Sequence, residues 1–203
     1  MNKELITSEL DRLFDNPKCE LNYTKDYELL IATVLSAQCT DKRVNVVTKD
    51  LFAKYNIESL ATINQKDLER IIYPCGSYTK KASYIITICN KLLNDYSGKV
   101  PNDRGYLESL PGVGRKTANV VLKNLYNVPC IPVDTHVIRV ANRLGIVDNE
   151  LNPLVIEQVL MERIPKKKWN KVGEQLLLFG RYHCKSINPN CKDCLFKRQC
   201  KKI

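Results

Sequence analysis

Lys116 and Asp134 are the residues of this sequence that are best placed to do chemistry. Lys116 follows a glycine-rich turn, Leu110–Gly114, and stands at the start of a helical pattern that runs past Leu122. The N-terminus of a helix carries a partial positive charge, which disfavours the ammonium form of a lysine there. The uncharged amine is the nucleophilic form. Asp134 precedes a second helical pattern, so we interpret the two as a candidate nucleophile and its carboxylate partner.

The turn before Lys116 is a candidate phosphate cradle. Gly112 and Gly114 allow a close backbone approach, and the N–H groups at a helix N-terminus attract anions. A turn of this kind can also be a simple connection, and Asp134 could serve only as a helix N-cap. A Walker phosphate loop is excluded, because Arg115 stands where that motif requires a glycine.

Four of the nine cysteines form a second chemical pattern near the C-terminus. Their spacings are six, two and five intervening residues, at Cys184, Cys191, Cys194 and Cys200. Four thiolates so close together indicate a metal or redox centre. The wide outer spacings favour an iron–sulfur cluster, whereas structural zinc sites use two closely spaced pairs, and both remain open on spacing alone. The other five cysteines have apolar neighbours and are predicted to be small core residues.

The charge of the chain is concentrated at one end. The 203 residues carry a net charge of +10, and residues 163–202 hold twelve basic and two acidic side chains, so this segment accounts for all of the excess. A basic segment of this kind indicates a polyanion such as nucleic acid, or else a solvated tail. We find neither a secretion signal nor an apolar run long enough to span a membrane, and expect a cytoplasmic, nucleoid-associated protein.

The elements that must position these residues are almost all helical. Apolar residues recur at helical spacing, no segment alternates as a strand does, and proline and glycine mark the breaks. One predicted helix is capped by Asp41. The main predicted helices cover residues 26–35, 41–52, 104–109, 115–126, 135–144, 153–164 and 168–183. The sequence therefore predicts an all-α protein.

Taken together, these motifs resemble the endonuclease III family of DNA glycosylases over nearly the whole chain. Leu110–Gly114 corresponds to the helix–hairpin–helix motif of the family, and Lys116 and Asp134 match its catalytic lysine and aspartate. The four C-terminal cysteines match the spacing of its 4Fe–4S cluster. Ser36–Asp41 matches a further family segment near the lesion pocket.

The resemblance implies two helical domains flanking a DNA cleft. Residues 19–129 would form a six-helix barrel domain that carries the helix–hairpin–helix motif. Residues 1–18 with 130–203 would form the domain of the iron–sulfur cluster. Lys116 and Asp134 would face each other across the cleft.

The resemblance also implies a bifunctional DNA glycosylase and AP lyase of base excision repair, which removes oxidised pyrimidines from duplex DNA. Lys116 would form an imine with the sugar, and β-elimination would then cut the strand on the 3′ side of the abasic site. Asp134 would act as a base or stabilise the positive sugar. The expected DNA contacts are Gln38, which fills the space of the flipped nucleotide, and Gly112, Val113, Gly114, Arg115, Lys192, Lys197 and Arg198.

One position departs from the family pattern. The family commonly carries a bulky apolar wedge after the glycine that matches Gly76, but this chain has Ser77, and Tyr78 could substitute. The role of His136 is open between lining the pocket and a structural contact. An adenine-mismatch glycosylase lacks the lysine, and an electron carrier would leave Lys116, Asp134 and the hairpin unexplained. A DNA-binding module with a zinc knuckle stays open as a non-enzymatic alternative. The expected partner is damaged double-stranded DNA, with no membrane and no obligate protein partner, and the simplest expectation is a monomer.

Overall fold

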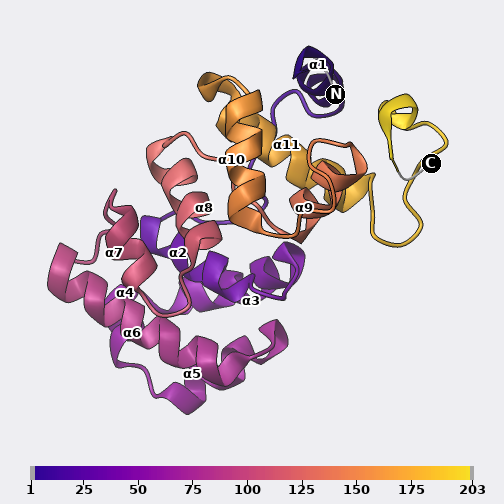
Figure 1. The fold of residues 1–203 in the computed structure, drawn as a ribbon. Coiled ribbons are helices and arrows are strands. Elements are labelled where there is room, and N and C mark those ends of the chain that lie inside the picture. Colours follow the sequence, from indigo (N-terminus) through magenta and orange to yellow (C-terminus); the bar gives the residue numbers. More distant parts are fainter. Residues whose placement is uncertain (1–2, 202–203) are drawn as a thin grey trace. The chain divides into compact units, whose positions relative to one another are not determined.

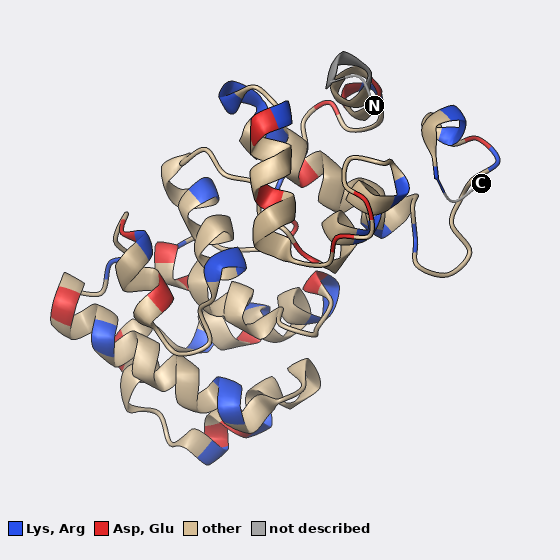
Figure 2. Ribbon diagram, viewed as in Figure 1, with Lys and Arg blue, Asp and Glu red and all other residues tan. Residues whose placement is uncertain are grey.

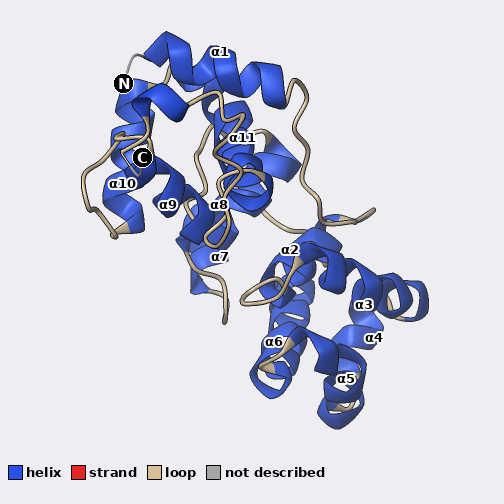
Figure 3. Cartoon of the chain, turned by 90° about the vertical axis from the view of Figure 1, so that its right-hand side faces the viewer, coloured by secondary structure: helices blue, strands red, loops and turns tan. Residues whose placement is uncertain are grey.

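The chain divides into two compact units, Cys19–Tyr126 and Met1–Lys18 with Asn127–Ile203. The computed structural model describes residues 3–201, and Figures 1 and 3 show helices joined by loops without any strand in that part. The prediction of an all-α fold is therefore confirmed. The ends of the predicted domain ranges at residues 1, 2, 202 and 203 lie outside the described residues. Between residues 3 and 201, none of the helices combines the length and apolar character needed to cross a bilayer.

The unit Cys19–Tyr126 is built around one buried helix, α2 (Asp26–Leu35). Nine of its ten residues are buried, in keeping with the run Leu29–Leu35, in which Thr33 is the single polar residue. Helices α3, α6 and α8 pack against it. The other elements of the unit are α3 (Asp41–Lys54), α4 (Ile57–Thr62), α5 (Gln65–Ile72), η1 (Tyr73–Cys75), α6 (Tyr78–Tyr96), α7 (Arg104–Ser109) and α8 (Arg115–Tyr126).

Side-chain caps set where several of these helices begin. Thr40 accepts a hydrogen bond from the backbone N–H of Arg43, so Thr40, and not Asp41, is the N-cap of α3. Asp41 is instead the first residue of the helix, where a negative charge interacts favourably with the helix dipole. The prediction that Asp41 is the cap was wrong by one residue, because Thr40 and Asp41 are adjacent and both are residue types that commonly cap helices.

The other unit encloses its own apolar core. Its elements are α1 (Lys3–Leu13), α9 (Thr135–Arg143), α10 (Pro153–Arg163), η2 (Lys166–Lys168), α11 (Trp169–Tyr182) and η3 (Lys197–Gln199). The core includes Leu10 of α1, Phe179 of α11 and Phe196 of the C-terminal loop, all at most 1% exposed. The N-terminal helix, the middle helices and the C-terminal loop are thus stabilised by one shared set of contacts.

Polar contacts of α11 tie distant parts of the chain into this unit. The side chain of Asn170 donates to Asn127 and accepts from the backbone N–H of Cys130. Residues 127–130 are therefore held by α11. The second segment of this unit begins at Asn127, whereas the sequence analysis placed that boundary after residue 129. The amide of Gln175 donates to Asp11 and to the backbone of Phe14, which fixes the end of α1 on the same helix.

Candidate functional site

The turn Leu110–Gly114 joins α7 to α8 in a conformation that requires glycine. Gly112 has a φ of +75°, and a Cβ atom there would lie 2.5 Å from the ring of Tyr84, so a larger residue would be strained and would clash. The N–H of Val113 donates to the carbonyl of Leu110 over 3.2 Å, and the Val113 side chain is buried. Gly112 and Gly114 are exposed, so the outer side of the turn can be reached from solvent.

Lys116 lies in the first turn of α8 and is half-buried. The helix begins one residue earlier, at the exposed Arg115. The buried face of α8, which includes Val121 and Leu122, packs the helix against α2 within the same unit. The lysine is therefore carried by a rigid element, and its position is set by the glycine turn before it.

Asp134 is the N-cap of α9. Its Oδ1 accepts hydrogen bonds from the backbone N–H groups of His136, over 2.9 Å, and Val137, over 3.1 Å. The capping role that the sequence left open is thus present, and it fixes the carboxylate at the positive end of the helix. Asp134 belongs to the unit that contains the C-terminal cysteines, and Lys116 belongs to the other unit.

His136 makes a contact of its own within the second unit. Its Nδ1 lies 3.1 Å from the guanidinium of Arg139, which also donates to the carbonyl of Gly180 over 2.8 Å. A Cβ atom at Gly180 would come within 2.8 Å of the Cβ of His136. These contacts give His136 a structural role in the packing of α9 on α11.

Gln38 borders an open hollow in the unit Cys19–Tyr126. The backbone of Gln38 is left-handed, with a φ of 57°, which is uncommon for a residue other than glycine. The hollow has a volume of about 570 Å³ and is lined by Gln38 and Arg43 together with Tyr73, Gly76 and Tyr78. The segment that the sequence placed near the lesion pocket and the loop expected to carry the wedge thus meet at one hollow.

A buried lysine that the sequence analysis did not single out joins these two loops. Lys81 of α6 is 5% exposed, and its Nζ donates to the backbone carbonyls of Leu35, Ala37 and Cys75 over 2.7–2.9 Å. Burial lowers the pKa of Lys81. The carbonyls come from the ends of α2 and η1, where helices leave carbonyl groups without intrahelical partners. One ammonium group therefore holds the two loops together.

The four C-terminal cysteines line a single small cavity of about 20 Å³ with Arg143, Phe179 and His183. They come from the loop that follows α11, and the buried ring of Phe196 holds this loop against Phe179 at a centroid distance of 5.2 Å. Within residues 3–201, no three Cys, His, Asp or Glu side chains are arranged to hold a metal ion. The cysteines thus surround a shared space without converging on one point.

The electrostatics of the cavity favour a positively charged group among the four cysteines. Burial raises the pKa of Cys194, and the three other cysteines raise it further, so four thiolates need a compensating cation. Arg143 supplies part of that charge, because its guanidinium lies 3.4 Å from Cys184 Sγ. It also donates to the carbonyl of Lys185 over 2.7 Å, which fixes the start of the loop.

The basic residues expected to contact DNA on the cysteine loop are accessible. Lys192, Lys197 and Arg198 are exposed, and Figure 2 shows blue segments on the short helical turn close to the C-terminus. Lys197 and Arg198 belong to η3, directly after the buried Phe196. The fold therefore presents these charges to solvent from a fixed loop.

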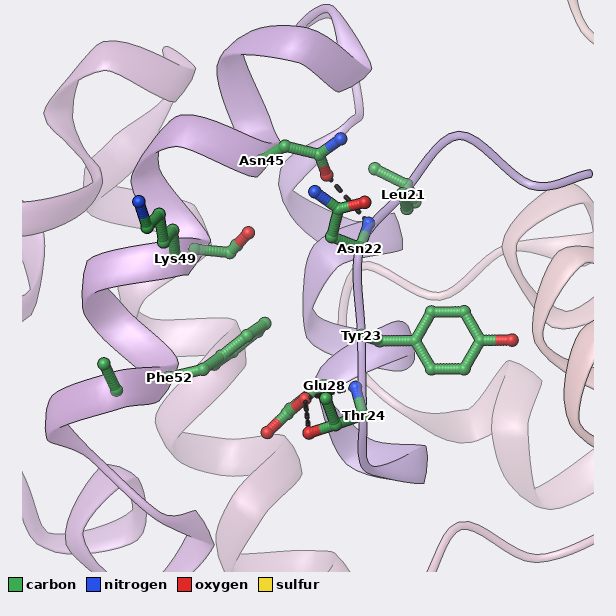
Figure 4. A pocket seen from close by; sticks show the side chains of 10 residues that line it. Leu21, Asn22, Tyr23, Thr24, Glu28, Asn45, Lys49 and Phe52 are labelled. Carbon is green, nitrogen blue, oxygen red and sulfur yellow. Dashed lines mark hydrogen bonds between the residues drawn. The ribbon is translucent and has the colours of Figure 1, made fainter.

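A further pocket holds none of the predicted site residues. It has a volume of about 510 Å³ and lies between residues 21–24 and α3, with Asn22, Lys49 and Phe52 among its lining residues (Figure 4). The Glu28 carboxylate at this pocket accepts hydrogen bonds from the backbone N–H and the hydroxyl of Thr24. The Glu28 carboxylate at this pocket stabilises the start of α2, so we assign the pocket a structural role.

Comparison with known families gives a match to the central part of the chain. Residues 31–166 match the model of the HhH-GPD superfamily of base excision DNA repair proteins. Endonuclease III of Bacillus subtilis is 43% identical over 199 residues, which cover 98% of this chain and 91% of that protein. Endonuclease III of Escherichia coli is 40% identical over 204 residues, which cover 98% of this chain and 96% of that protein.

Solved structures of similar proteins agree with the sequence relatives. A trapped covalent intermediate of an endonuclease III with DNA has a TM-score of 0.94 and 44% identity, covering all of this chain and 97% of that one. A non-covalent complex of endonuclease III with DNA has a TM-score of 0.95 at the same identity, covering all of this chain and 96% of that one. A thermostable thymine-DNA glycosylase, at 23% identity and a TM-score of 0.83, shares the fold.

The glycine turn can be tested by adding one methyl group at either glycine. Gly112→Ala should lower stability by about 1–3 kcal/mol, because its left-handed backbone and the ring of Tyr84 both oppose a Cβ atom. Gly114→Ala is the matched control, since no atom lies within 4 Å of its Cβ position. Urea titration should show a lower midpoint for the first variant only, and equal midpoints would contradict the close approach to Tyr84.

The buried ammonium can be tested by removing its charge. Lys81→Met should lower the melting temperature by about 5–10 °C, because two buried carbonyls and a partly buried one lose their hydrogen-bond donor. The neighbouring Lys80 is exposed, and Lys80→Met should melt within about 1 °C of the unsubstituted protein. Calorimetry that finds both variants equally stable would show that the three bonds contribute nothing.

Proposed function

The chain belongs to the endonuclease III family within the HhH-GPD superfamily of base excision DNA repair proteins, and we propose how its residues carry out the reaction. It is a DNA glycosylase with AP lyase activity. The relatives cover nearly the whole chain, so the activity is assigned to the chain as a unit. What remains to be assigned is the role of each residue.

We propose that Lys116 is the nucleophile. The observation that carries this role is its place in the first turn of α8, just after an exposed turn that is left-handed at Gly112 and leaves no room there for a Cβ atom. A relative at 44% identity forms a covalent intermediate with DNA, and such an intermediate requires a nucleophilic side chain. A primary amine that adds to the sugar explains both base removal and strand cleavage.

The proposed reaction proceeds in two stages. The uncharged Nζ of Lys116 bonds to C1′ of the damaged nucleotide, and the bond from C1′ to the base breaks, so the base leaves with its electron pair. The sugar ring opens to give an imine between Lys116 and C1′. The imine makes the C2′ proton acidic, and loss of that proton breaks the bond from C3′ to the 3′ phosphate oxygen. Water then releases the enzyme from the shortened strand.

We propose that Asp134 acts on the same deoxyribose. Its carboxylate is fixed by two backbone hydrogen bonds at the start of α9, which suits a group that must not reorient during the reaction. It would either accept the proton of the attacking amine or stabilise the positive sugar as the base leaves. Both roles use the carboxylate oxygens of Asp134.

The DNA contacts are proposed from exposure and charge. The backbone amides of Gly112 and Gly114 hold a phosphate next to the damaged nucleotide, with the exposed Arg115 beside them. The amide of Val113, which the sequence also suggested as a DNA contact, already donates to the carbonyl of Leu110, so Val113 contributes by its buried side chain. The damaged base must leave the stack before Lys116 can reach its sugar, and Gln38 occupies the space it leaves. The exposed cations of the cysteine loop, Lys192, Lys197 and Arg198, bind the phosphate backbone further along.

Endonuclease III proteins carry a 4Fe–4S cluster, and we infer that the C-terminal cysteines of this chain hold one. All four thiols line one small cavity, and their sequence spacing is the one expected for such a cluster. When bound, such a cluster supplies four iron–thiolate bonds and can exchange an electron. None of the steps above uses an electron, so we assign the cluster the role of fixing the loop that carries the basic residues.

The remaining assignments follow from the proposed reaction. We propose oxidised pyrimidines in double-stranded DNA as the substrates. We also propose that the protein acts as a monomer, because each assigned group comes from a single chain, and that it works at the nucleoid, where its substrate lies.

The nucleophile can be tested by trapping with borohydride. Reduction of the imine should join the enzyme to a duplex with one thymine glycol, and Lys116→Gln should lower the yield of the adduct at least about a thousandfold. Lys91→Gln, which removes an exposed lysine from α6, is the control and should trap normally. An undiminished adduct with Lys116→Gln would remove Lys116 from the mechanism.

The cysteine cavity can be tested by metal analysis. The protein purified without oxygen should contain about four iron and four sulfide per chain. Cys194→Ser should lose most of both, whereas Cys19→Ser, outside the cavity, should keep them. Zinc in place of iron, or iron that is indifferent to Cys194→Ser, would contradict the assignment.

A further inference from the structure

The loop that should part the two DNA strands lacks a suitable side chain at its tip. Ser77 is exposed and left-handed, with a φ of 45° and a ψ of 32°. A wedge must present an apolar or aromatic surface to the bases that it separates. The hydroxymethyl group of serine has too little surface for this, so another side chain must supply it.

Two aromatic rings stand beside this position. Tyr73 opens η1 and Tyr78 opens α6, and their ring centroids lie 4.9 Å apart at an angle of 48°. Tyr78 is half-buried, whereas Tyr73 is 63% exposed, among the largest exposures of any apolar or aromatic side chain in the described residues. Tyr78 thus supports one side of the Tyr73 ring, and the rest of that ring faces solvent.

A single exposed aromatic ring is ordinary on a protein surface, and it is the surroundings of Tyr73 that indicate a function. Tyr73 lines the same open hollow as Gln38, which we assign to the gap left by the flipped nucleotide, and Arg43 borders it as well. The hollow therefore combines a ring that can stack on bases, an amide that can bond to them and a cation that can bind phosphate. A distorted DNA duplex offers a binding partner for each of these groups: unstacked bases for the ring, base edges for the amide and phosphates for the cation.

The two walls of this hollow are fixed to each other. The ammonium of Lys81 binds the carbonyl of Ala37, directly before Gln38, and the carbonyl of Cys75, two residues after Tyr73. Pro74 restricts the backbone between Tyr73 and that carbonyl. The ring of Tyr73 and the amide of Gln38 are thus held at a fixed distance from each other. Two side chains that enter a DNA duplex together need such a fixed arrangement.

We propose that Tyr73 is the residue that stacks into the duplex beside the flipped nucleotide, with Tyr78 supporting it and Gln38 filling the gap. This inference rests on the proposed function of the chain. Tyr73 takes the place of the missing wedge at residue 77, and it does so from the residue that precedes the loop. Its role is to keep the damaged nucleotide out of the stack, and it takes no part in bond breaking.

The test compares substrates that do and do not need strand separation. Tyr73→Ala should lower kcat/KM about tenfold or more on a duplex with one thymine glycol. Tyr73→Phe should stay within about twofold, because stacking needs the ring and not the hydroxyl. Tyr96→Ala is the matched control, since Tyr96 is also exposed and also contacts a second tyrosine, Tyr106, at 4.6 Å.

A single-stranded oligonucleotide with one abasic site separates stacking from chemistry and folding. Tyr73→Ala should form the borohydride-trapped adduct with it as well as the unsubstituted protein does. Equal losses on single and double strands, or full activity of Tyr73→Ala on the duplex, would overturn the proposal. If the unsubstituted protein forms no adduct on either substrate, the proposed function itself fails.

A fluorescent readout tests the contact directly. We would bind each variant to a duplex that carries a stable abasic analogue and 2-aminopurine next to it, and record the fluorescence of 2-aminopurine. The unsubstituted protein and Tyr73→Phe should change this signal by the same amount, because both rings stack there. Tyr73→Ala should lose most of the change at saturating protein, and an unaltered signal would place another residue at that position.

Discussion

The left-handed backbone at Gly112 is the constraint on which the proposed site depends. Only glycine fits there, because the ring of Tyr84 occupies the space of a side chain. The turn lets α8 begin at once, with exposed glycines on both sides of Val113 and Lys116 in the first helical turn. The proposed phosphate site and the place of the proposed nucleophile thus both depend on one backbone torsion.

A single buried charge plays the corresponding role for the two loops that we propose contact DNA. Lys81 satisfies carbonyls at the ends of α2 and η1, which would otherwise be left without partners. The same bonds fix the distance between the loop of Gln38 and the loop of Tyr73. The stability of this unit and its proposed grip on DNA therefore depend on the same three hydrogen bonds, so substitutions here will affect both.

The sequence predicted what local patterns determine and missed what distant contacts determine. Helices with clear breaks, such as α7 and α8, have the predicted bounds, because proline and glycine mark their ends. Helix α4 (Ile57–Thr62) was missed, because neither proline nor glycine stands near its ends to mark a break. Lys81 lies on the apolar face of α6 in line with Ile85 and Ile88, which is a visible signal. Two of its acceptors, however, are carbonyls more than forty residues away in the sequence. The sequence alone does not show that these residues lie close together in the fold.

The most direct test of the account is to identify the amino acid that carries the sugar in the trapped adduct. The unsubstituted protein would be reduced on a duplex with one abasic site, digested with nuclease and protease, and analysed by tandem mass spectrometry. We predict that the residual deoxyribose is attached to Nζ of Lys116. Attachment at any other lysine, or at the N-terminal amine, would contradict the central claim.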